Sequence, residues 1–80
     1  SIYTDEYTAL IQTLKSVRIA SGKTQVQCAK ELGRPQSFMS DVEAGTRRLD
    51  VIQLRTMCRI FGISLTDFIN LLEQKINSEE

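Results

Sequence analysis

Histidine and tryptophan are absent from this 80-residue chain, and cysteine occurs only twice, at Cys28 and Cys58. Two cysteines are too few for a disulfide framework. A zinc site without histidine would need thiolates and carboxylates alone, so we expect no metal. Both thiols are instead expected to be small apolar core residues, as suits a reducing cytoplasm.

The chain also lacks an apolar run of about 18 residues, and its first residues are not a basic segment followed by an apolar one. Neither a membrane span nor a signal peptide is therefore expected, and we place the protein in the cytoplasm. No glycine loop is suited to phosphates, and no Ser or Cys lies beside a plausible base. Asp41 and Glu43, two apart on a predicted helix, point to different faces. We expect no enzyme and no cofactor.

The formal net charge is zero, but the charges are unevenly distributed. Residues 15–48 hold seven basic and three acidic side chains, whereas the rest of the chain holds three basic and seven acidic ones. A neutral protein can still present a local basic face, because screening limits charge attraction to roughly 8 Å at physiological salt. The central segment is therefore the candidate for contact with an anion.

The hydrophobic pattern is helical throughout the chain, with no alternating stretch that would indicate a strand. Apolar residues recur at intervals of three and four over residues 7–17, which predicts a first helix. Thr4 or Asp5 can cap its start, and Gly22 can end it.

Two short helices are predicted next. Thr24 offers a cap for the second helix and Gly33 ends it, since glycine readily takes a positive φ. Arg34 cannot continue that helix before Pro35, which suits the start of a third helix at about 36–43. The expected inner residues of these two helices are Cys28, Ala29, Leu32, Met39 and Val42.

After a loop at 44–48, Asp50 is expected to cap a fourth helix that Gly62 ends. Its expected inner residues are Val51, Leu54, Cys58 and Phe61. Ser64 and Asp67 form a start signal for a fifth helix through about Ile76, with a frayed tail at 77–80. These elements predict one all-α domain over residues 1–80, a compact five-helix bundle with its core at about 5–76.

The second and third helices, joined by a glycine-bearing turn, have the arrangement of a helix-turn-helix unit. If their apolar residues face the core, the polar positions of the third helix are forced outward together, namely Gln36, Ser37, Ser40 and Asp41. Such a helix can enter the major groove with its N-terminal residues at base edges. Phe38 is expected to lie partly outward, where it would touch a thymine methyl or, as we favour, cover the edge of the core.

The ordered set of Thr24-Gln25, Ala29 to Gly33, Gln36-Ser37, Ser40 to Gly45 and Phe61 to Leu65 resembles the phage-repressor family of helix-turn-helix proteins. This is the Cro/C1 or xenobiotic-response-element type, and the resemblance covers roughly residues 10–70. It implies a lambda-repressor-like fold, a bacterial or phage-encoded protein, and binding to double-stranded operator DNA.

The resemblance also implies roles for matched positions. Gln25 would bind a phosphate, Gln36 would read a base, and Ser37, Ser40 and Asp41 would flank it. Arg18 and Glu43 would form a structural ion pair between the first helix and the end of the third. The arginines that flank the third helix are expected to contact phosphates, namely Arg34, Arg47 and Arg48.

Three positions depart from the family pattern. Lys23 stands where an apolar residue is usual, and Pro35 replaces a capping Ser or Thr. Asp41 puts a carboxylate at a reading position, where it can accept from cytosine N4 but repels phosphate. We interpret Asp41 as a specificity determinant that rejects wrong sites.

The fifth helix holds more apolar residues than its share of the core requires, and we expect a homodimer through Ile69, Leu72 and Ile76. The leading hypothesis is a small transcriptional regulator, most simply a repressor. The alternative is an antitoxin or interaction module whose main partner is another protein.

Overall fold

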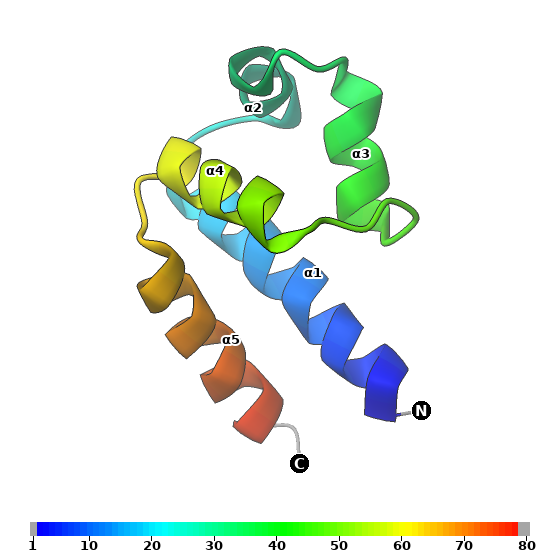
Figure 1. Ribbon diagram of the computed structural model, residues 1–80, viewed down its shortest axis with the longest axis vertical. Coiled ribbons are helices and arrows are strands. Elements are labelled where there is room, and N and C mark those ends of the chain that lie inside the picture. Colours follow the sequence, from blue (N-terminus) through cyan, green and yellow to red (C-terminus); the bar gives the residue numbers. More distant parts are fainter. Residues whose placement is uncertain (1, 79–80) are drawn as a thin grey trace.

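The computed structural model describes residues 2–78, with side chains from Asp5 onward, and this part contains five helices and no strand. The helices are α1 (Ile2–Ala20), α2 (Gln25–Leu32), α3 (Gln36–Ala44), α4 (Val51–Phe61) and α5 (Leu65–Ser78). Figure 1 shows them as a compact bundle. The predicted all-α, five-helix architecture is confirmed.

Capping residues set most helix boundaries where the sequence predicted them. Thr24 and Asp50 each complete a capping box, in which the side chain accepts from the backbone N–H three residues later and the Gln at that position bonds back. Gly33 and Gly62 end α2 and α4 in the left-handed conformation. Ser64 Oγ accepts from the Asp67 N–H at 3.0 Å, so the predicted start signal of α5 is also present.

Helix ends near the termini extend further than predicted. α1 begins at Ile2, so Thr4 and Asp5 lie inside the helix and the prediction that one of them caps it is wrong. No proline or glycine precedes them to stop the helix earlier. α5 continues to Ser78 instead of ending at Ile76, and the last two residues of the predicted frayed tail lie outside the described residues.

α1 packs against α5 and α3. α5 packs along it, with the start of α1 and the end of α5 at the same end of the molecule in Figure 1, and α3 packs on another side of it. α2 packs against α3 and α4, and α4 also contacts α5. This arrangement places α3 and α5 on different sides of α1. None of the described helices is long and apolar enough to cross a membrane.

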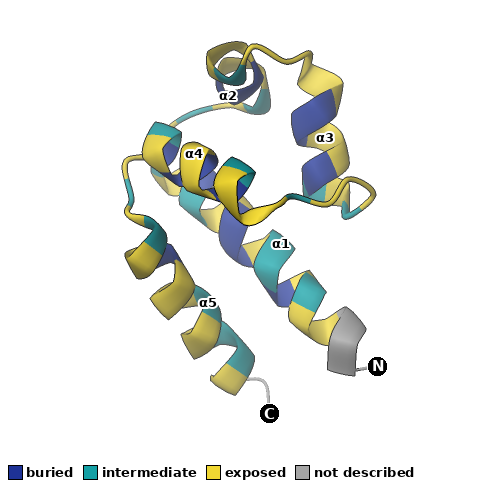
Figure 2. Ribbon diagram, in the orientation of Figure 1, coloured by how far each residue is buried: buried dark blue, intermediate teal, exposed yellow. Residues whose placement is uncertain are grey.

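The core lies where α1 to α4 converge, as the buried ribbon segments in Figure 2 show. Phe68 joins it from α5. Its fully buried side chains include Phe68, Leu14, Met39, Met57, Val42, Cys28 and Cys58. The predicted inner residues of α2 and α3 are confirmed, although Leu32 is only half-buried.

Val51 was expected inside and is instead 61% exposed, while Met57, which was not predicted, is fully buried. At 3.6 residues per turn, the four buried residues of α4 centre on a direction roughly 70° away from Val51. Val51 therefore lies at the edge of the apolar face. Its neighbour Ile52 is exposed as well.

Candidate nucleic-acid interface

The turn at 33–35 sets the angle between α2 and α3. Gly33 has a φ of +69°, and the next N–H, from Arg34, donates to the Ala29 carbonyl at 2.9 Å. Pro35 is extended, with φ −69° and ψ 159°, and gives α3 no side-chain cap. The start of α3 therefore lacks a side-chain acceptor, as the departure from the family pattern predicted.

The outer face of α3 is polar. Gln36, Ser37, Ser40 and Asp41 are all exposed, whereas Met39 and Val42 on the opposite face are fully buried. Within residues 5–78, none of the four exposed side chains forms a hydrogen bond or ion pair. The structure thus brings all four predicted base-reading residues to one surface with their donors and acceptors unused.

A buried ion pair ties α1 to the end of α3. The Arg18 Nε donates to Glu43 Oε2 at 2.5 Å and its Nη2 to Glu43 Oε1 at 3.1 Å. The two side chains are 11% and 5% exposed, and this hydrogen bond raises the pKa of Arg18. The pair expected from the resemblance is present.

The same carboxylate also holds the predicted phosphate-binding residue of α2. The Gln25 Nε2 donates to Glu43 Oε1 at 3.0 Å, which fixes Gln25 at the N-terminus of α2. Arg18 in turn donates through Nη1 to the Lys23 carbonyl at 2.8 Å, just before α2. Glu43 therefore links the start of α2 to the end of α3. The Lys23 Nζ lies 2.6 Å from Glu31 Oε2, so this ammonium group forms an ion pair at the surface.

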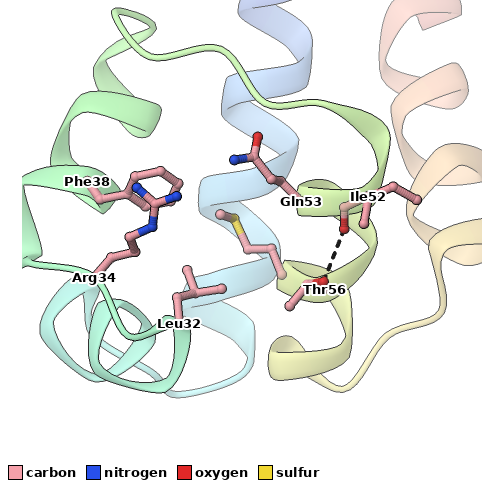
Figure 3. A pocket seen from close by; sticks show the side chains of 7 residues that line it. Leu32, Arg34, Phe38, Ile52, Gln53 and Thr56 are labelled. Atoms are coloured by element: carbon pink, nitrogen blue, oxygen red, sulfur yellow. Dashed lines mark hydrogen bonds between the residues drawn. The ribbon is translucent and has the colours of Figure 1, made fainter.

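Phe38 is only 7% exposed, so the expectation that it lies partly outward is wrong, whereas the favoured alternative, that it packs on the core, agrees with the structure. Its ring joins the core and is covered by two arginines that flank α3. The Cζ atoms of Arg34 and Arg47 lie 4.8 Å and 5.1 Å from the ring centroid. Figure 3 shows the Arg34 guanidinium beside the Phe38 ring. A ring face attracts a cation within about 6 Å, which explains how the arginines complete its burial.

Arg48, the third predicted phosphate-binding arginine, lies on a different ring. Its Cζ is 4.2 Å from the centroid of Tyr7 in α1. Arg34, Arg47 and Arg48 are all exposed. The contacts of these guanidinium groups with the Phe38 and Tyr7 rings were not predicted from the sequence. Only the spacing of four between Arg34 and Phe38 offered a signal, since Tyr7 and Arg48 are distant in sequence.

A hollow of about 170 Å³ opens between α2, α3 and α4 beside Phe38. Figure 3 shows its lining, in which apolar side chains predominate. Two polar residues there already have partners: Gln53 accepts from the Asp50 N–H at 2.9 Å, and Thr56 donates to the Ile52 carbonyl at 3.1 Å. The hollow is therefore an apolar recess next to Arg34, and no pattern in the sequence predicts it.

The predicted dimer residues lie on α5, away from α3 (Figure 1). Ile69 is 37% exposed, whereas Leu72 and Ile76 are half-buried. Leu71 is more exposed than any of these, at 42%. α5 therefore leaves an apolar surface uncovered. Two of the three predicted residues, Leu72 and Ile76, also bury part of their side-chain surface within this chain.

Both cysteines are free and buried, as predicted. Burial raises the pKa of Cys28, and it raises the pKa of Cys58 to about 11. A thiol is reactive as its thiolate, so neither cysteine is poised for chemistry at neutral pH.

Comparisons with known proteins agree with this geometry. The family model of a helix-turn-helix domain matches residues 9–68. An XRE-family like protein from Pseudomonas syringae pv. tomato str. DC3000 has a similar solved structure, with a TM-score of 0.84 and 42% sequence identity. The alignment covers 91% of this chain and 89% of that one. No curated protein matches the chain.

Proposed function

Since the chain belongs to the helix-turn-helix family of Cro/C1-type DNA-binding proteins, we propose that it recognises an operator through α3 and represses transcription there. The observation that carries this proposal is the outer face of α3, where four exposed polar side chains have no partner among residues 5–78. The proposed activity is binding, not catalysis. The repressor would act by occupying promoter DNA.

Base reading is assigned to the first turns of α3. Gln36 lies at the N-terminus of the helix, where a side chain reaches deepest into a major groove. Its amide pairs bidentately with adenine, and Ser37 and Ser40 accept or donate to neighbouring bases. Asp41 accepts from cytosine N4, and its charge disfavours any placement that brings it close to a phosphate.

Phosphate contacts are assigned to both flanks of α3. Gln25 is fixed by Glu43 at the start of α2, where unpaired backbone N–H groups also favour an anion. Arg34, Arg47 and Arg48 are exposed at the two ends of α3. Phosphate contacts set the register of a protein on DNA, so these four residues would orient α3 for reading.

In vitro selection from random duplex DNA tests this function. We expect one enriched site, bound with submicromolar affinity that falls steeply as salt rises, because cationic side chains release counterions from DNA. Binding that is undetectable across the library, or insensitive to salt, would contradict the proposal. A protein partner would then become the better explanation of the exposed apolar surface of α5.

We assign homodimerisation to α5, through Ile69, Leu72 and Ile76 with Leu71 beside them. A two-fold contact presents the same patch from each copy, and a dimer would match half-sites about one DNA turn apart. Ile69→Glu is expected to shift sedimentation towards the monomer, while Lys30→Glu, an exposed control on α2, leaves it unchanged. A wild-type chain that sediments as a monomer on and off its DNA site would refute the dimer.

A further inference from the structure

The Phe38 ring gathers two arginines from opposite ends of α3. Arg34 precedes the helix, Arg47 follows it, and both guanidinium carbons lie within about 5 Å of the ring centroid. The two charges are therefore within about 10 Å of each other. An arginine side chain has many rotamers in solution, so attraction to a shared ring restricts both residues to one place beside α3.

No acidic side chain among the described residues neutralises these two charges. Among residues 5–78, neither Arg34 nor Arg47 forms an ion pair or a hydrogen bond with a carboxylate. The ring supplies their attraction without consuming the guanidinium N–H donors, which point along the plane of the group. Those donors match the geometry of phosphate oxygens, and an anion beside both groups would relieve the repulsion between them.

We propose that Phe38 is a positioning residue for DNA-backbone binding, whose ring holds Arg34 and Arg47 as one phosphate-binding unit. The inference rests on the proposed DNA-binding function and names a residue that does not itself touch the DNA. At 7% exposure Phe38 is covered by the arginines it holds. Preorganised side chains lose less freedom on binding, so the ring strengthens contacts made by its neighbours.

A purely structural role for Phe38 predicts something different. Loss of the ring would then weaken folding and would change DNA affinity equally whether or not the two arginines are present. A positioning role predicts that the effect on affinity depends on the arginines. The coupling between the substitutions therefore separates the two roles.

The test is a double-mutant cycle on the selected duplex. Phe38→Leu is made in the wild type and in the Arg34→Gln, Arg47→Gln background, and binding is measured at temperatures where circular dichroism shows every variant folded. Preorganisation of one long side chain corresponds to about twofold to twelvefold in affinity. We expect Phe38→Leu to weaken binding about tenfold in the wild type and less than twofold in the background without the arginines.

Met39→Leu is the matched control, because Met39 is the next residue, is fully buried, and carries no arginine. It is expected to leave affinity unchanged in both backgrounds. The arginine substitutions themselves should lower the slope of log affinity against log salt by about 1 each, since each removes a phosphate contact. Phe38→Leu keeps both charges and should leave that slope nearly unchanged.

A second measurement needs no variant at position 38. In NMR spectra of the folded wild type, ring current should shift the side-chain protons of Arg34 and Arg47 upfield, and added duplex should perturb both together. Unshifted signals, or an equal effect of Phe38→Leu in both backgrounds, would overturn the inference while leaving DNA binding intact. A wild type that binds no duplex would overturn both proposals.

Discussion

Removal of one partner of the Arg18–Glu43 pair is expected to cost far more stability than removal of one partner of the surface pair Lys23–Glu31. Glu43→Ala removes the acceptor of two Arg18 hydrogen bonds and one from Gln25. It leaves a guanidinium whose side chain is only 11% exposed without its counter-charge. Removal of one partner of a buried pair costs about 3–5 kcal/mol, because the remaining charge is poorly solvated.

That loss is large for a protein of this size. At about 0.05–0.15 kcal/mol per residue, a domain of 80 residues has a free energy of unfolding of roughly 4–12 kcal/mol. Glu31→Ala breaks a pair whose side chains are 31% and 46% exposed, so it should cost less than about 1 kcal/mol. The two variants differ in burial and not in the type of charge removed.

The assay is urea unfolding followed by far-UV circular dichroism, since the chain has no tryptophan to report by fluorescence. Replacement of both partners, Arg18→Met with Glu43→Leu, should recover most of the stability lost in Glu43→Ala, because no charge is then left buried. The reasoning is refuted if Glu43→Ala costs no more than Glu31→Ala, or if the double replacement is as unstable as the single one.

Two further predictions concern stability. Gly33→Ala should lower the free energy of unfolding by about 1–2 kcal/mol in the same urea assay, because φ at this position is +69° and alanine disfavours a positive φ. Nothing crowds the added methyl group, so the backbone conformation is the whole cause. An unchanged urea midpoint would show that the turn relaxes freely. For Cys58, the folded pKa of about 11 lies above the usual value of 9.0, so the folded state retains a proton that the unfolded state loses. The contribution of the Cys58 thiol to the free energy of unfolding is complete below pH 9 and should be lost progressively as pH rises to about 11. Cys58→Val should flatten that part of the stability profile, and identical profiles would contradict the assignment.

Local signals account for what the sequence predicted well. Thr24 and Asp50 act through capping hydrogen bonds to residues three positions away, and Gly33 acts through its own backbone dihedral angles. Their roles can therefore be predicted from the local sequence. The outward face of α3 followed from helical periodicity once its inner residues were identified. The ion pair between Arg18 and Glu43 was predicted from the family resemblance, because the local sequence pattern does not relate two residues 25 positions apart.

Long-range packing accounts for the failures. Periodicity allowed either Val51 or Met57 inside α4, and only the position of the neighbouring helices decides between them. Phe38 packs into the core and is also covered by Arg34 and Arg47. The position of Arg47 over the ring cannot be predicted from the sequence pattern of α3, because Arg47 lies outside that helix. The roles of the exposed residues in DNA binding remain predictions, since they depend on a partner.

Gln36→Ala tests the central claim, sequence recognition by α3, most directly. Binding of the wild type and the variant is titrated on the selected duplex and on a scrambled duplex at one salt concentration, with Arg34→Gln as a control that should weaken both. A bidentate base contact is worth about 1–3 kcal/mol, or roughly 5- to 150-fold in affinity. We predict that loss for Gln36→Ala on the selected duplex and less than twofold on the scrambled one. Equal effects on the two duplexes, or none on either, would contradict recognition through α3.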